Sequence, residues 1–366
     1  MRNFILVNIF LFIGLISQAQ TDSLIFENPS FTSILIGSDN LYAINKDGRL
    51  TAWNLTTLEK VFQSSDTIYT SIAKDKGDDI FLGTEKGTIF KLNQTDYSIK
   101  EYLKLKKDYR IDYIFFNSSN EIFLIVPYAV YDPVKDKYWN NFTHEANGMI
   151  VQKRFLFFFN KRTDTYFDMP QYTFIDSKDR IWMTKSFGEF GGSLQLFDTK
   201  NRKVLKSNID SLNFGLLFPK SVFEDDNQNI FITSGLQHFI NSGEIYKIEN
   251  MTAKVIYNSK DYRDSTHTNH FSSGIFVGPG IYNSKEQKIY FATTNGFYRM
   301  DVPINGKIKS HELIFTPDLS WEREPLAIGV GMTIKKLVFT NDNRLVFLTS
   351  NNGIGIIDGQ KTIMLK

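Results

Sequence analysis

Short apolar segments, each preceded by a polar turn, recur along the whole chain. Every copy opens with three apolar or aromatic residues in a row, and a few polar residues separate it from a second short apolar segment. We call the central residue of each triplet the anchor residue. The seven anchor residues are Tyr42, Phe81, Phe123, Trp182, Phe231, Tyr290 and Val346. They recur at an average spacing of about 51 residues, close to the period of a propeller blade.

The residues around each triplet favour short strands joined by tight turns. The polar pairs before the triplets are Asp39-Asn40, Asp78-Asp79, Asn120-Glu121, Asp179-Arg180, Gln228-Asn229, Gln287-Lys288 and Asn343-Arg344. A glycine follows every triplet except the third, where Val126-Pro127-Tyr128 stands instead. Further apolar stretches on both sides give each unit three strands and often a fourth, as at 203–205. No long window has a 3.6-residue apolar period, so we expect very little helix.

These units predict an all-β fold, a seven-bladed β-propeller of four-stranded antiparallel blades. One small sheet cannot bury both of its faces, whereas stacking around an axis lets each blade cover its neighbour. We therefore expect the anchor residues to pack between blades. If the ring closes, the region of Tyr42 must pack on that of Val346. We expect a segment from one of the two termini to form the outer strand of blade seven, and residues 362–365 are favoured over the N-terminal segment because they follow that blade directly.

Several copies resemble known propeller repeats. The segment 47–61, DGRLTAWNLTTLEKV, resembles a WD40 or quinoprotein-type blade, although Asn54 stands where the WD dipeptide has Asp. The segments 79–87 and 179–184 resemble the repeats of two-component-regulator-type sensor propellers. These resemblances imply the fold, and they carry no quinone-binding or kinase residue over to this chain.

The first nineteen residues have the pattern of a secretory signal peptide. Arg2 precedes an apolar run from Phe4 to Ile16, and Ser17-Gln18-Ala19 gives a small-x-small cleavage pattern. The run is too short to span a membrane, and no later segment resembles a span. We expect one propeller domain over residues 20–366 in a mature bacterial protein that is exported to the periplasm, the cell surface or the medium.

The composition of the chain limits the kinds of partner and functional site that we expect. The chain of 366 residues has 42 Lys and Arg against 40 Asp and Glu and no Cys. The balanced charge argues against a nucleic-acid partner, and the lack of Cys excludes disulfides and thiolate sites. No catalytic or phosphate-binding motif is present, so we expect no cofactor. We also expect no metal, because His267 and His270 are too few ligands for a site. The acidic pairs Asp78-Asp79 and Asp225-Asp226 fit turns better than calcium or catalysis.

The longest loops are predicted to emerge at one end of blades four to seven, where they concentrate aromatic, Arg and His side chains. The candidate contact residues are Phe187, Phe190, His238, Tyr262, Arg263, His267, His270, Trp321 and Arg323. The first hypothesis is a non-catalytic propeller that binds a protein or carbohydrate partner through this face. The alternative is a hydrolase or lyase at the mouth of the channel, with His267 or His270 as base and Arg263 or Arg323 as an anion clamp. Core capping by Phe187, Phe190 and Trp321 is an equally good interpretation of those aromatics.

Overall fold

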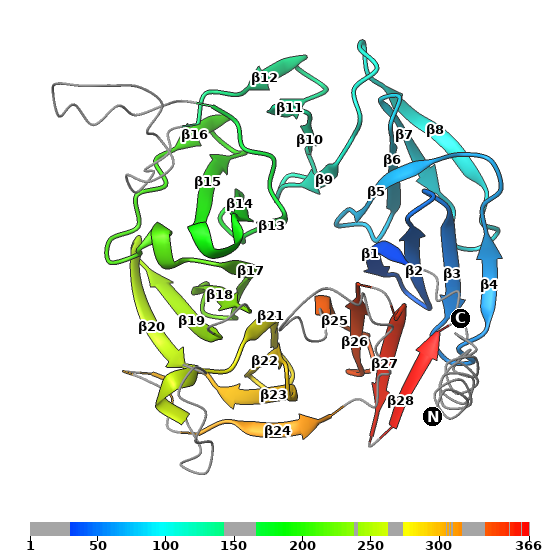
Figure 1. Ribbon diagram of the computed structural model, residues 1–366. Coiled ribbons are helices and arrows are strands. Elements are labelled where there is room, and N and C mark those ends of the chain that lie inside the picture. The colour runs from blue at the N-terminus through cyan, green and yellow to red at the C-terminus, as the bar shows by residue number, and fades with distance from the viewer. Residues whose placement is uncertain are drawn as a thin grey trace, which may run out of the picture.

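Seven four-stranded antiparallel sheets form a ring around a central axis (Figure 1). The computed structural model of the protein describes residues 30–142, 166–237, 241–262, 274–304, 306, 308, 310–316, 334–350, 352–359 and 361–365. The predicted signal peptide, residues 1–19, lies outside this part of the chain. The predicted all-β, seven-bladed propeller of four-stranded blades is confirmed.

Each blade is a meander whose consecutive strands pair, from the innermost strand near the axis to the outermost. Blade one consists of β1 (Phe31–Ile36), β2 (Asn40–Asn45), β3 (Leu50–Asn54) and β4 (Lys60–Gln63). Blade two consists of β5 (Tyr69–Lys74), β6 (Ile80–Thr84), β7 (Thr88–Leu92) and β8 (Ile99–Lys104). Blade three consists of β9 (Tyr113–Phe116), β10 (Ile122–Val126), β11 (Ala129–Asp132) and β12 (Lys137–Trp139). Blade four consists of β13 (Tyr172–Ile175), β14 (Arg180–Ser186), β15 (Gly192–Asp198) and β16 (Lys203–Leu205).

The other three blades repeat the arrangement. Blade five consists of β17 (Pro219–Glu224), β18 (Ile230–Leu236), β19 (Ser242–Glu249) and β20 (Thr252–Asn258). Blade six consists of β21 (Val277–Asn283), β22 (Lys288–Thr293), β23 (Gly296–Asp301) and β24 (Glu312–Phe315). Blade seven consists of β25 (Ile334–Phe339), β26 (Leu345–Thr349), β27 (Ile354–Asp358) and β28 (Lys361–Leu365). Among the described residues the only helices are short 3-10 turns: η1 (Gly188–Phe190), η2 (Phe214–Leu216) and η3 (Ser259–Tyr262).

The turns between the first and second strands define one end of the propeller, which we call the turn face. In six blades the residue two positions before the triplet has a positive φ, between 56° and 72°. These residues are Asp78, Asn120, Asp179, Gln228, Gln287 and Asn343. Asp and Asn tolerate this left-handed conformation better than other non-glycine residues. The predicted turn role of the acidic pairs is thereby confirmed for Asp78-Asp79.

A side chain at the start of most of these turns caps the backbone that follows. Asp176 Oδ1 accepts hydrogen bonds from the N–H groups of Lys178 at 3.0 Å and Arg180 at 2.8 Å. The same pattern occurs at Asp75, Asn117 and Asp225. A carboxylate or amide oxygen that accepts two N–H bonds holds a tight turn without any bound ion. This accounts for Asp225, as the turn interpretation predicts.

Hydrogen bonds between neighbouring turns and loops also join the blades around the turn face. The N–H and hydroxyl groups of Ser118 in blade three both donate to the Asp179 carboxylate of blade four, each at 2.6 Å. Every neighbouring pair of blades has at least one such bond. They join Asn40 to Tyr97, Asn120 to Asp75, Ser118 to Asp179, Ser177 to Glu224, Tyr282 to Asp226, Asn283 to Asn343 and Asn341 to Ser38.

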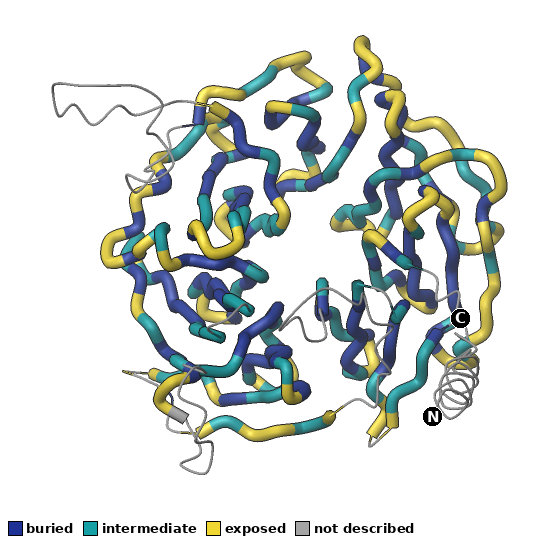
Figure 2. The backbone as a smooth tube through the Cα atoms, in the orientation of Figure 1, coloured by how far each residue is buried: buried dark blue, intermediate teal, exposed yellow. Residues whose placement is uncertain are grey.

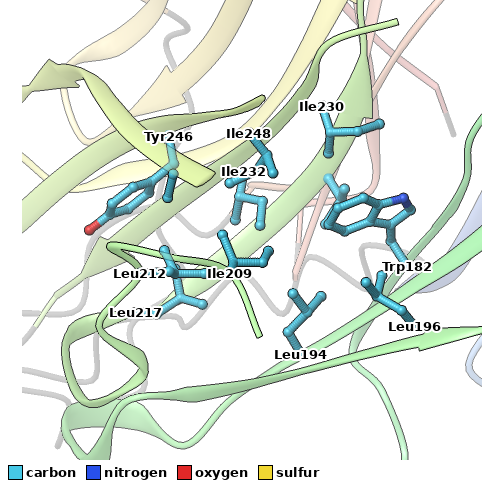
Figure 3. Close-up of a cluster of buried hydrophobic side chains, with 12 residues drawn as sticks. Trp182, Leu194, Leu196, Ile209, Leu212, Leu217, Ile230, Ile232, Tyr246 and Ile248 are labelled. Atoms are coloured by element: carbon cyan, nitrogen blue, oxygen red, sulfur yellow. The ribbon is translucent and has the colours of Figure 1, made fainter. Parts of the chain in front are cut away.

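The apolar core is divided among the seven seams between blades, and each seam contains one anchor residue. Side chains alternate between the two faces of a strand. In every blade the anchor residue lies on the face that packs against the following blade, and its two neighbours in the triplet lie on the other face. Trp182 of blade four, for example, packs with Ile230 and Ile232 of blade five (Figure 3). Its Nε1–H donates to Asp176 Oδ2 at 2.8 Å, which satisfies the buried indole. Figure 2 shows the buried backbone inside the ring and exposed segments along the outer strands.

The first and last blades close the ring. Val346 and Leu348 of blade seven share a buried cluster with Leu41 and Ala43 of blade one, as predicted. Tyr42 itself lies in the seam with blade two, because it points to the opposite face from its neighbours. The outer strand of blade seven is β28, which pairs with β27, so the predicted place of residues 362–365 is confirmed.

Candidate functional site

The long loops of blades four and five emerge at the end opposite the turn face, which we call the loop face. In a four-stranded antiparallel meander, the connection from second to third strand and the connection to the next blade lie at the same end. Phe187 and Phe190 belong to the β14–β15 loop, and Tyr262 ends η3 in the connection after β20. The other six predicted contact residues lie outside the described residues. They are His238, Arg263, His267, His270, Trp321 and Arg323.

The β14–β15 loop presents an aromatic side chain to solvent. Its backbone is closed by a hydrogen bond of 2.8 Å from the N–H of Phe187 to the carbonyl of Gly191, around η1. Phe187 is half-buried, and the Lys185 ammonium lies 5.3 Å from the centre of its ring. Phe190 is 65% exposed. The core-capping interpretation therefore fits Phe187 in part and does not fit Phe190.

The neighbouring η2, in the connection to blade five, packs against η1. The Asn213 side chain caps η2 by accepting a hydrogen bond of 3.0 Å from the N–H of Gly215. Phe214 packs against the core cluster around Trp182, whereas Leu216 is 60% exposed. Two exposed apolar side chains, Phe190 and Leu216, thus lie on adjacent helical turns. We call η1 and η2 together the η1–η2 ridge.

Glycine makes the close packing of this ridge possible. Gly191 has a φ of +89°, and a Cβ atom there would lie 2.3 Å from the carbonyl oxygen of Phe214. A side chain would therefore push η1 away from η2, as well as straining the backbone. Gly188 also has a positive φ, +65°, but a Cβ atom there would meet no atom within 4 Å.

A buried carboxylate holds the base of the ridge. Asp168, which precedes blade four, accepts from Lys185 Nζ at 2.7 Å and from the Ser193 hydroxyl at 3.0 Å. Lys185 and Ser193 face each other across the β14–β15 pair. Asp168 therefore ties both strands of this hairpin to the preceding connection. The backbone of Tyr262 belongs to η3, which lies at the outer edge of blade five, after β20, and is not part of the ridge (Figure 1).

The inner strands contain polar and charged residues that the sequence pattern did not single out. At corresponding positions, side chains reach from one blade to the next. The Ser71 hydroxyl donates to Ile111 O at 2.8 Å, the Tyr113 hydroxyl to Pro170 O at 3.3 Å, and Lys336 Nζ to Ile34 O at 3.0 Å. Burial raises the pKa of Tyr113 to about 12, so its hydroxyl remains a donor at neutral pH. Lys220 and Lys335 lie next to such positions in β17 and β25, each at a register shift that hides it from a period-two pattern.

No group of three or more His, Asp or Glu side chains in the described part of the chain is arranged to hold a metal ion. No helix among those residues is long and apolar enough to cross a membrane. The chemistry that the ridge offers is apolar contact area with a fixed backbone beneath it.

The comparisons with known proteins concern the fold. No family model and no curated protein matches the chain. Among solved structures, the dihydro-heme d1 dehydrogenase NirN in complex with DHE is similar, with a TM-score of 0.51 and 10% identity over 92% of this chain and 67% of that chain. The β-propeller domain of Cps50 (Swd1) from Myceliophteria thermophila is similar with the same TM-score and identity, over 90% of this chain and 97% of that one.

At 10% identity these likenesses show the fold alone. The chain is a seven-bladed propeller that resembles both a d1-heme-related propeller and a WD40 propeller. The more specific resemblance to sensor propellers stays a prediction.

Proposed function

We propose that the protein is an exported, non-catalytic β-propeller that binds a protein partner through its loop face, with the η1–η2 ridge as the centre of the contact. The observation that carries this proposal is the exposure of Phe190 and Leu216 on two packed helical turns. Exposed apolar side chains on a fixed backbone bind a partner at low entropic cost, and such patches are typical of interfaces.

The composition of the ridge favours a protein over a carbohydrate. An aromatic ring alone suits a sugar as well as a protein, but the aliphatic side chain of Leu216 adds apolar area with no polar group. The support beneath the ridge also fits this role, because Gly191 and the Asp168–Lys185 pair fix its position before a partner binds. The remaining candidate residues of blades four to seven, from His238 to Arg323, are proposed to surround this centre. Export is supported by the pattern of residues 1–19.

The test is capture of partners from an envelope fraction by the purified protein and by variants. The double variant F190S/L216S removes the exposed apolar area, and V134S is the matched control. Val134 is 77% exposed and lies in the β11–β12 turn on the turn face. We expect the parent and V134S to retain the same protein, identified by mass spectrometry, and the double variant to lose it.

Two results would contradict the proposal. Capture that is unchanged in F190S/L216S would show that the ridge is not the interface. Binding on a panel of immobilised glycans, together with no protein captured, would assign the face to carbohydrate instead. The mass of the mature protein from its own cells tests export separately, because an intact chain that still contains residues 1–19 would exclude cleavage of the leader.

A further inference from the structure

Lysines occupy corresponding positions in the innermost strands of blades five and seven. Lys220 and Lys335 each lie at a register shift in the pairing of the first strand with the second. Each lies three residues before the strand partner of the anchor residue, and near the loop-face end of its strand. A bulge places two residues opposite one and redirects a side chain, and such bulges are common beside binding sites.

Lys336 is the neighbour of Lys335 within β25 and is exposed, although this strand is the innermost of blade seven. One of its three N–H donors bonds to Ile34 O of blade one. No other acceptor among the described residues bonds to this ammonium, so its other two N–H groups can donate to a further acceptor. Lys336 as a residue is exposed, whereas its ammonium lies among the blades, where burial lowers the pKa of Lys336.

No described carboxylate balances these lysines. The charged group that acts on Lys335 is another lysine, Lys46 of the β2–β3 turn, and burial together with this positive charge lowers the pKa of Lys335. The strands β1, β21 and β26, which pack against β25, contain no charged residue. The β2–β3 turn adds Arg49 and a single exposed carboxylate, Asp47.

The surroundings of Lys220 are similar. The strands β13, β18 and β21 beside it contain no charged residue, and β14 contributes only Arg180 and Lys185. Its ammonium lies 5.7 Å from the ring of Phe276, and burial lowers its pKa. The carboxylate at the corresponding place in blade three, Asp112, is already paired with Arg110 at 2.8 Å.

We propose that the loop-face end of the central axis is an anion-binding site, in which Lys335, Lys336 and Lys220 bind the carboxylate or phosphate groups of a small, multiply charged ligand. Cations in a partly desolvated place, with no carboxylate partner among the described residues, are stabilised by an anion that binds them. Two of these lysines come from adjacent positions and the third from two blades away, so a ligand with two or more anionic groups fits better than a single ion. This site is separate from the η1–η2 ridge and does not depend on its function.

Calorimetric titration of the full chain with inorganic pyrophosphate and with citrate, at constant ionic strength, tests the site. Glucose is the neutral control ligand. We expect one or both anions to bind at about millimolar affinity or tighter, and K335M to weaken that binding about tenfold, the effect of losing one charge-assisted hydrogen bond. K220M should weaken it as well. The matched control is K60M, which removes an exposed lysine from the outer strand β4.

K335M is the main variant because Lys336 also bonds across the seam and K336M can lower stability for that reason. A preference for pyrophosphate over citrate, or the reverse, identifies the phosphate or the carboxylate as the favoured group. The proposal fails if neither anion binds, or if K60M weakens binding as much as K335M, which would indicate a general charge effect. It also fails if K335M and K220M bind both anions as tightly as the parent.

Discussion

The Lys336 ammonium donates a hydrogen bond of 3.0 Å to the carbonyl oxygen of Ile34, 302 positions away in the sequence. It joins the innermost strands of the last and first blades. At the turn face the same two blades are joined by Arg344, whose Nη2 donates to Leu55 O at 2.6 Å. All four described strands of blade seven come from one continuous segment, 334–365. Side chains and the buried cluster between them therefore close the ring.

Deleting residues 359–366 should destabilise this closure. The deletion removes β28, exposes the edge of β27, and takes the buried Leu365 out of the seam. Loss of a buried leucine alone costs about 2–5 kcal/mol, and an unpaired strand edge promotes aggregation. Size-exclusion chromatography and thermal unfolding should show aggregates and a lower Tm. A monodisperse deletion variant with the parent's Tm would contradict closure through β28.

Substitution of an anchor residue should open a cavity between two blades. W182A removes the largest side chain of its seam, and we expect a loss of about 3–5 kcal/mol in the free energy of unfolding. W182F keeps part of the apolar contact but loses the bond to Asp176, so its loss should be smaller. Y128A, at a 77% exposed position, is the control and should change stability by no more than about 0.5 kcal/mol. Denaturant unfolding measures all three; equal stability of W182A and Y128A would contradict the packing.

The two glycines of the β14–β15 loop should respond differently to alanine. Both G188A and G191A place a side chain at a positive φ, which costs about 1 kcal/mol or more. Only G191A also collides with the backbone of η2. Hydrogen exchange should therefore become faster in residues 187–191 and 213–217 of G191A, and partner capture should weaken, while G188A keeps the ridge in place. Identical exchange in the two variants would show that η1 and η2 are not held together through Gly191.

The repeated pattern of the sequence was sufficient to predict the fold, because each blade buries its second strand on both faces. A triplet of apolar residues centred on Phe231 or Trp182 marks such a strand, and the polar pair before it marks the turn. The direction in which Tyr42 points was not evident, because a triplet with apolar residues on both faces does not reveal which neighbour each side chain meets.

The candidate site was less predictable because it depends on contacts between distant segments. Phe190 could be placed on a loop from the sequence, but its proximity to Leu216 depends on how two connections pack around Gly191. The inner lysines were missed for a different reason. The uninterrupted apolar stretch of β25 begins at Leu337, so the apolar pattern does not include Lys335 and Lys336, whereas the strand begins at Ile334. A bulge shifts the alternation by one residue, and the shift hides such positions from a period-two analysis.

Blade five offers a pH test of the electrostatics. Lys247 and Lys254 lie 2.6 Å and 2.7 Å from the Glu249 carboxylate, and their hydrogen bonds lower the pKa of Glu249 to about 2. An unfolded chain has a Glu pKa near 4.3, so the ionised carboxylate stabilises the folded state above that pH, and the stabilisation is lost as pH falls towards about 2. The side chain is 30% exposed, and solvent screening limits the effect to about 1 kcal/mol.

We therefore expect E249Q to be less stable than the parent by up to about 1 kcal/mol at pH 7. The difference should shrink between pH 4.3 and 2 as the parent's carboxylate becomes protonated. E59Q is the control, because Glu59 is exposed beside β4 and forms no ion pair among the described residues. Urea unfolding across this pH range measures both variants. A stability difference for E249Q that stays constant down to pH 2 would show that the lost contacts are not those of the ionised carboxylate.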